Sequence, residues 1–121
     1  MQVMPAVGRA VARGLRFPVW DPVLLYQADV NVQLGMAHLA ELDERYEPTA
    51  HVLAAYNAGA SRVERWKEKR GAGDVEIFVE RIPYVETRNY VRIIERNRDF
   101  YRALYDWGAV PLSAAASGGR P

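Results

Sequence analysis

Apolar residues that recur every three or four positions constrain the fold of this chain most strongly. The clearest series lies on one face of a predicted helix: Val32, Met36, Leu39, Leu42 and Tyr46. A second series predicts a long final helix: Tyr90, Ile94, Asn97, Tyr101 and Leu104. No alternating apolar and polar pattern reaches the length of a useful strand. Prolines and glycines divide the chain into roughly six helical segments, so we expect an all-α architecture with short loops.

Cap and stop residues predict where several helices begin and end. Pro5 suits the first position of a helix, where its missing N–H costs nothing. Thr49, Ser61 and Asp74 carry side-chain oxygens that can accept hydrogen bonds from first-turn N–H groups, so we expect each to cap a helix. Gly59 can adopt the left-handed conformation that ends a helix.

Composition excludes several kinds of site. A chain of 121 residues predicts one domain, and its 50% hydrophobic and 26% charged residues are ordinary for a globular protein. The net charge of +1, with acids and bases interspersed, argues against a nucleic-acid surface. The absence of cysteine excludes disulfides and thiolate ligands. His38 and His51 stand alone without metal-like spacing, so we expect no metal site and no cofactor.

The two ends of the chain contain no recognisable export or membrane segment. Three arginines (Arg9, Arg13 and Arg16) interrupt the apolar residues near the start, which predicts an amphipathic helix and no signal peptide. A mitochondrial transit peptide is the less favoured alternative. No apolar run approaches the roughly 20 residues that span a bilayer. Residues 107–121 are small and low in complexity, and they predict a disordered tail.

Residues 53–59 form a short apolar helical run that ends in Tyr56, Asn57 and a glycine. Two interpretations compete for this segment. Tyr56 is either a packing residue inside a capped core helix, or it presents a hydroxyl group on a rigid edge of a site. The segment alone favours the packing interpretation, and the neighbouring motifs decide between the two.

Three separated motifs resemble a known family. They are Met-Gln-Val-Met-Pro at residues 1–5, Ala-Ala-Tyr-Asn-Ala-Gly at 54–59, and Ile-Pro-Tyr-Val-Glu-Thr-Arg-Asn-Tyr-Val at 82–91. Together they resemble the catalytic domain of the soluble lytic transglycosylases (SLT), which has a lysozyme-like fold. The resemblance implies that residues 1–106 are the C-terminal part of such a domain.

The resemblance implies a reaction and a substrate. The family cleaves the glycosidic bond between N-acetylmuramic acid and N-acetylglucosamine in peptidoglycan, and it leaves an anhydromuramoyl product. One glutamic acid serves first as acid and then as base, which requires a partly desolvated carboxyl group. The implied partner is the peptidoglycan glycan strand, and the implied location is the periplasm or cell envelope.

The resemblance also assigns substrate-binding roles. Gln2 and Met4 would line saccharide subsites, and Tyr56 would place its hydroxyl near the catalytic carboxylate. Asn57 would fix the turn or bind sugar, and Glu86 would lie across the site. The alternative for Tyr56 and Glu86 is a hydrogen-bonded pair in the core. For Gln2 and Met4, the alternative is that fraying of the chain terminus undoes any site there.

The family's catalytic glutamate lies in a Glu-Ser-x-Phe segment that precedes the first motif. We therefore expect a domain truncated at its N-terminus, lacking the first catalytic helix, with no catalytic residue of its own and no activity as given. The uncovered apolar faces predict low stability or self-association. The alternative function is a non-catalytic peptidoglycan-binding or partner-dependent module. A generic helical interaction domain is less favoured, because it does not explain the three motifs.

Overall fold

The computed structural model describes residues 2–70 and 73–105, and this part of the chain is all helical. Six α-helices and one 3-10 helix follow one another: α1 (Pro5–Gly14), η1 (Pro22–Tyr26), α2 (Ala28–Arg45), α3 (Thr49–Ala58), α4 (Ala60–Arg70), α5 (Val75–Glu80) and α6 (Val85–Tyr105). The predicted all-α class is confirmed. The predicted tail at 107–121 lies outside the described residues. Within the described ranges, no helix is both long and apolar enough to cross a membrane.

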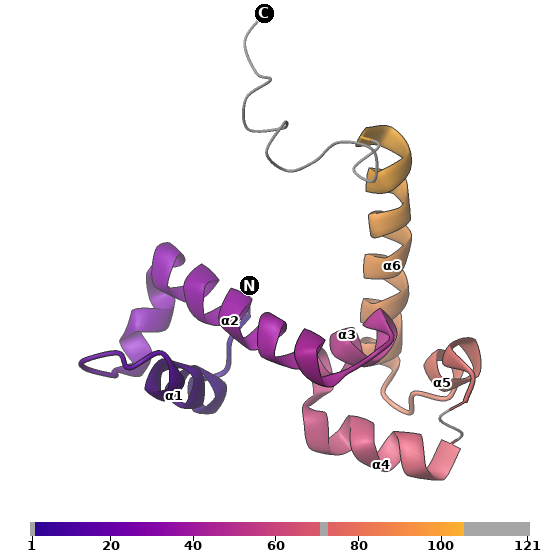
Figure 1. Cartoon of the computed structure of the whole chain (residues 1–121), viewed down its shortest axis with the longest axis horizontal. Coiled ribbons are helices and arrows are strands. Elements are labelled where there is room, and N and C mark those ends of the chain that lie inside the picture. Colours follow the sequence, from indigo (N-terminus) through magenta and orange to yellow (C-terminus); the bar gives the residue numbers. More distant parts are fainter. Residues whose placement is uncertain (1, 71–72, 106–121) are drawn as a thin grey trace, which may run out of the picture.

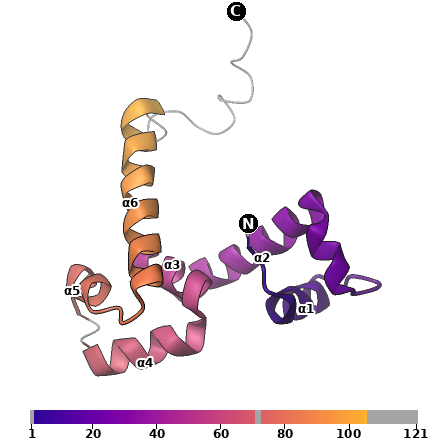
Figure 2. The same ribbon diagram turned by 180° about the vertical axis from the view of Figure 1, so that it is seen from behind.

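Helix α3 lies at the centre of the arrangement and packs against α2, α4 and α6. On one side of it, α1 and η1 pack against α2 (Figure 1). On the other side, α5 bridges α4 and α6. The last turns of α6 extend away from the other helices, as the two opposite views show (Figure 2). Helix α3 therefore joins the side of the fold that contains α1, η1 and α2 to the side that contains α4, α5 and α6.

The core consists of two clusters of buried residues. The larger surrounds α3 and includes Val52, Phe78, Ile82 and Val91. The smaller joins α1 to the first half of α2, and the half-buried Trp20 packs against it. A Cβ atom on Gly8 would lie only 2.6 Å from the Trp20 ring, so a larger residue there would push this ring away from α1.

Two of the predicted helix starts are confirmed. Pro5 is the first residue of α1. The Asp74 carboxylate accepts hydrogen bonds from the N–H groups of Glu76 and Ile77, at 2.9 and 3.1 Å, and so caps α5. Gly59 ends α3 with a φ angle of 95°, a conformation that glycine adopts without strain.

The predicted caps at Thr49 and Ser61 are wrong. Pro48 is the N-cap of α3, and Thr49 already belongs to the helix. The Thr49 Oγ1 atom accepts a hydrogen bond from Arg98 Nη1 at 3.1 Å, so a distant residue on α6 engages the oxygen that was expected to cap. Helix α4 begins at Ala60, two residues before the start that a cap at Ser61 implies, which places Ser61 inside its first turn.

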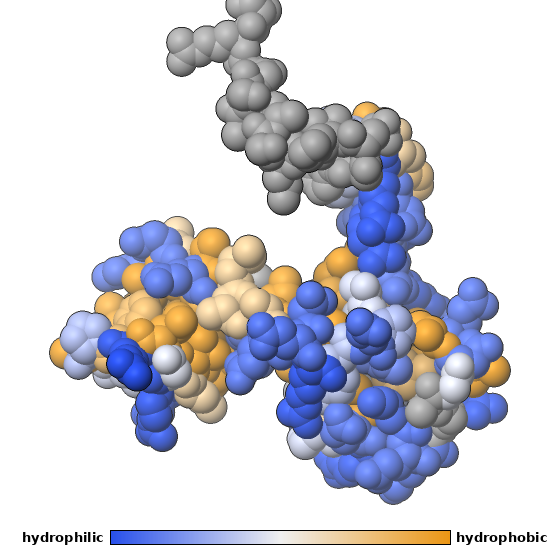
Figure 3. Space-filling view, viewed as in Figure 1, coloured by the Kyte–Doolittle hydropathy of each residue, from blue (hydrophilic) through white to orange (hydrophobic). Residues whose placement is uncertain are grey.

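The apolar face predicted on residues 32–46 is only half covered. Leu42 and Tyr46 are buried against the main core, as expected, but Val32 is 49% exposed and Met36 is 57% exposed. The first half of α2 instead turns Leu34 toward α1, because α1 and η1 pack on that side. In one view of the surface, apolar residues gather over α1 and α2 (Figure 3).

The last helix shows the same departure from its predicted face. Tyr90 and Ile94 pack against the main core, whereas Tyr101 and Leu104 are exposed. Helix α6 packs on α3 and α5, and its last turns extend beyond both of them (Figure 1). The predicted self-association through an open apolar face stays a prediction.

We expect His51 to make the stability of the fold depend on pH. Its ring is buried, lies edge-on to Phe78 with 4.2 Å between ring centroids, and places Nδ1 3.3 Å from the Glu47 carbonyl oxygen. Burial lowers the pKa of His51 below its ordinary value of 6.5. As the pH falls through 6.5, the unfolded chain takes up a proton that the native histidine resists, so the free energy of unfolding falls.

We expect denaturant unfolding to show lower stability at about pH 5.5 than at about pH 8, and we expect His51→Gln to lose part of this dependence. The comparison of the two proteins isolates His51, because every other titrating group is common to both. An identical pH dependence in the variant would contradict the assignment.

Candidate functional site

The five side chains that the sequence predicted to bind substrate lie around one cavity of about 370 Å³. Its lining residues are Gln2, Met4, Tyr56, Asn57, Glu86 and Tyr90. They come from three separate parts of the chain: the segment before α1, the end of α3 and the first two turns of α6. The fold therefore brings the three sequence motifs together. A role in binding sugar stays a prediction for each of these residues.

Tyr56 lies at the end of α3 with its hydroxyl group buried but unpaired. The oxygen has no hydrogen-bond partner among the described residues, although buried polar groups are nearly always paired. The Tyr56 ring lies 5.5 Å from the His38 ring, which fixes its orientation on α3. Burial raises the pKa of Tyr56, so the phenol stays neutral and can donate a hydrogen bond. A buried hydroxyl group beside a cavity can therefore form a hydrogen bond with a bound ligand.

Asn57 connects α3 to α6 at the edge of the cavity. The Thr87 hydroxyl donates a hydrogen bond to Asn57 Oδ1 at 2.7 Å, and Thr87 is itself buried. The amide is therefore held in one orientation by a residue 30 positions later in the chain. This contact fixes the relative position of the two helices that carry Tyr56 and Glu86.

Replacing Thr87 with valine tests this connection. Valine keeps the shape of the side chain but leaves the Asn57 oxygen without its donor, so we expect unfolding to become easier by about 1 kcal/mol. The measurement is denaturant unfolding, with the exposed Ser61→Ala as the control. Equal stability of Thr87→Val and wild type would show that the hydrogen bond does not hold the helices.

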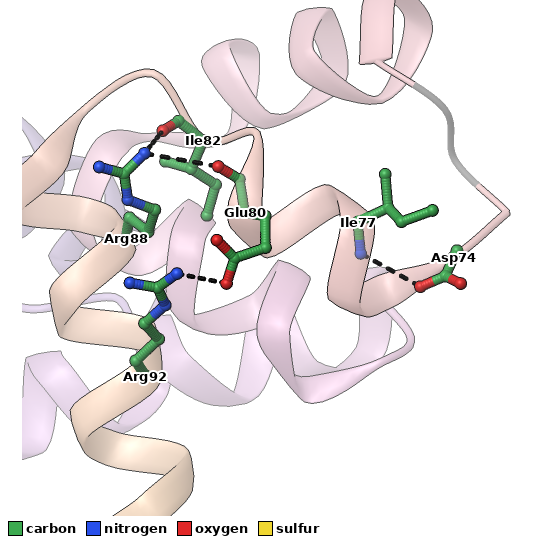
Figure 4. Close-up of polar contacts among 6 residues, drawn as sticks. All are labelled: Asp74, Ile77, Glu80, Ile82, Arg88 and Arg92. Carbon is green, nitrogen blue, oxygen red and sulfur yellow. Dashed lines mark hydrogen bonds and ion pairs between the residues drawn. The ribbon is translucent and has the colours of Figure 1, made fainter.

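Arginine contacts fix the start of α6, and with it the position of Glu86. Arg88 Nη1 lies 3.4 Å from the carbonyl oxygens of both Glu80 and Ile82, and Arg92 forms an ion pair with the Glu80 carboxylate (Figure 4). Arg88 thus ties the first turn of α6 to the segment that precedes it. Glu86 is exposed in the first turn of α6, where the helix dipole favours a carboxylate.

Comparison with known proteins identifies the family. A model of the transglycosylase SLT domain matches residues 1–79. The chain belongs to this family. It is 32% identical to the soluble lytic murein transglycosylase of Escherichia coli K12 over 124 aligned positions, which cover 99% of this chain and 19% of the relative. It is 31% identical over 105 positions to the Salmonella typhimurium enzyme of the same name, covering 84% of this chain and 16% of the relative.

A Haemophilus influenzae protein that carries the same name provisionally is 37% identical over 108 positions, covering 86% of this chain and 18% of the relative. The SLT chain thus spans less than a fifth of the length of these curated relatives. The SLT model covers four of the five predicted site residues, and Glu86 lies beyond its last matched position.

Sequence reasoning missed Tyr90 as a lining residue of the SLT cavity. The apolar spacing placed it only on the core face of the last helix, and it does pack against the main core. Its ring also lines the cavity, and burial raises its pKa, with a smaller contribution from Tyr56. The sequence feature that could have predicted this is the position of Tyr90 one helical turn after Glu86, since residues four apart share a helix face.

Carboxyl groups in the described part of the SLT chain do not lie in the buried, apolar surroundings that a general acid needs. Glu64 and Glu95 are half-buried, and the other glutamates, Glu86 included, are exposed. The hydrogen bond from Tyr46 lowers the pKa of Glu64, which is opposite to what an acid catalyst needs. Nor do three His, Cys, Asp or Glu side chains gather as a metal site anywhere in the described ranges.

Proposed function

We propose that the cavity binds the glycan strand of peptidoglycan and forms one wall of a lytic transglycosylase site. The observation that carries this proposal is the convergence of three distant motifs on one cavity of about 370 Å³. That volume lies in the range of roughly 300–1,000 Å³ that is typical of small-ligand pockets. The family membership and the names of the relatives support the same substrate.

The lining residues suit an uncharged sugar. The buried phenol of Tyr56 can donate to a sugar oxygen, and Gln2 can donate and accept through its amide. The Glu86 carboxylate can accept hydrogen bonds from sugar hydroxyl groups. Met4 and the Tyr90 ring supply apolar surface for the C–H faces of a pyranose. We propose that these residues orient the strand, and we assign no catalytic role to any of them.

Cleavage in this family needs a desolvated carboxyl group, and no glutamate in the described ranges is fully buried. This observation favours a second candidate function, a glycan-binding module that does not cleave by itself or that acts with a partner. Both candidate functions act on peptidoglycan, so we propose that the protein works in the bacterial periplasm or cell envelope.

Incubation of the chain with purified peptidoglycan, followed by mass analysis, separates the two candidates. We expect the chain to bind the polymer in a sedimentation assay and to release no anhydromuramoyl products above background. Sustained release of those products by the chain alone would show that one of its own carboxylates acts as the acid. Absence of binding would overturn the proposed function itself.

A further inference from the structure

Three arginines lie along the solvent-facing side of α1 and just beyond its end. Arg9, Arg13 and Arg16 are spaced by four and then three residues, and residues at these spacings are neighbours on one side of a helix. All three are exposed, whereas the other side of α1 packs against η1 and α2. We call these three residues the arginine stripe.

The arginine stripe has no partner within the described part of the protein. None of its three guanidinium groups forms an ion pair or a hydrogen bond with another described residue. No acidic residue precedes Asp21 in the sequence. Glu41 of α2 lies at a small hollow beside α1, but its carboxylate lies 3.9 Å from His38 Nδ1. The stripe therefore presents three positive charges that no neighbouring acid neutralises.

Arg16 occupies a position where the backbone favours glycine. Its φ angle of 58° is the only positive value for a residue other than glycine in the described ranges. Its N–H donates to the Arg13 carbonyl oxygen at 3.1 Å, and the N–H of Phe17 donates to the Ala12 carbonyl oxygen at 2.9 Å. These are the hydrogen bonds of a helix end that usually contains glycine. An exposed arginine adds no packing there, which favours a use of its charge outside the fold.

Exposed aliphatic side chains accompany the arginine stripe. Leu15 is 44% exposed and Val19 is 71% exposed, and Arg16 lies between them in the sequence. In Figure 3, strongly hydrophilic residues lie beside apolar surface over α1. Guanidinium groups bind phosphates, and aliphatic side chains enter the boundary between lipid headgroups and acyl chains. A soluble polyanion would bind only the arginines, so the combination favours an anionic lipid surface.

We propose that the arginine stripe, together with Leu15 and Val19, binds the surface of an anionic phospholipid bilayer. Each arginine near such a surface strengthens binding by about fivefold, and salt weakens this contribution. The aliphatic side chains add a contribution that salt does not screen. The proposal does not depend on glycan binding, because the stripe shares no residue with the candidate cavity.

Sedimentation with lipid vesicles tests this proposal. We expect the chain to sediment with vesicles of phosphatidylglycerol and phosphatidylethanolamine, and to remain in solution with vesicles of phosphatidylcholine. We expect Arg9→Gln/Arg13→Gln to weaken binding to the anionic vesicles by about 25-fold. The matched control is Arg65→Gln/Lys69→Gln, which removes the same charge from exposed positions on α4 and should weaken binding by less than about threefold.

Two single variants separate the contributions of charge, backbone and apolar surface. Arg16→Gly removes one charge and suits the left-handed backbone, so we expect about fivefold weaker vesicle binding together with unfolding at a higher denaturant concentration. Val19→Ser should weaken binding to anionic vesicles by about fivefold and leave any binding to soluble polyphosphate unchanged.

Several results would overturn the proposal. One is that the wild-type chain fails to sediment with the anionic vesicles. Another is an equal loss of binding in the α1 and α4 double variants, which would mean that net charge alone drives the association. Wild-type vesicle binding by Val19→Ser, with equally tight binding of polyphosphate, would assign the stripe to a soluble polyanion instead. The replaced side chains are exposed, so the variants are expected to fold, and circular dichroism checks this.

Discussion

Replacing Phe78 with alanine is expected to lower the free energy of unfolding by about 3–5 kcal/mol. The Phe78 ring is 1% exposed, lies in the main core cluster and contacts the edge of the buried His51 ring. Its removal would leave a cavity between α3 and α5 that small neighbours cannot fill. Domains of this size are stable by only about 5–15 kcal/mol, so the variant would lose a large part of its stability.

Denaturant unfolding followed by circular dichroism measures this effect. The matched control is Ile77→Ala, because Ile77 is the preceding residue of the same helix and is 45% exposed. We expect the control to cost clearly less than Phe78→Ala, since its side chain loses less buried surface. Similar losses for the two variants would mean that α5 does not seal the core around α3.

Replacing Tyr56 with alanine is expected to weaken binding of the N-acetylglucosamine trimer by about tenfold or more. The ring lines the cavity, and its buried hydroxyl has no partner within the described part of the protein. Tyr56→Phe keeps the ring against His38 and removes only the hydroxyl, so we expect a smaller loss, about three- to tenfold. Titration calorimetry of both variants separates the contributions of ring and hydroxyl.

A control for these variants is Tyr84→Phe. The Tyr84 ring packs against Trp66 outside the cavity, so loss of its hydroxyl should leave glycan binding unchanged. If Tyr56→Phe binds as well as Tyr84→Phe does, the hydroxyl plays no part in recognition. If a folded Tyr56→Ala variant also binds normally, Tyr56 is only a packing residue, which is the interpretation that its segment alone favoured.

Local sequence patterns predicted the positions of the helices well. They were less successful in predicting which faces of those helices are covered. The helix that carries Val32 and Met36 is present, but these two residues stay exposed because α1 packs on the Leu34 side. Periodicity defines a face, and only the tertiary arrangement determines whether a neighbour covers it. The cap at Thr49 failed for a related reason, since Arg98 engages its oxygen from 49 residues away.

The candidate site was predicted more completely than the packing around it. The family motifs contain all five predicted site residues, and the fold places them around one cavity: Gln2, Met4, Tyr56, Asn57 and Glu86. The motifs do not show which contacts hold these side chains in place. The hydrogen bond from Thr87 to Asn57 links two helices whose pairing no local pattern states.

The most direct test of glycan binding at the cavity is a titration of the ¹⁵N-labelled chain with the N-acetylglucosamine trimer, followed by amide chemical shifts. We predict saturable shifts in the segment before α1, at the end of α3 and in the first turns of α6, centred on Gln2, Tyr56 and Glu86. Saturable shifts confined to the exposed face of α4, or no saturable shifts at all, would contradict it.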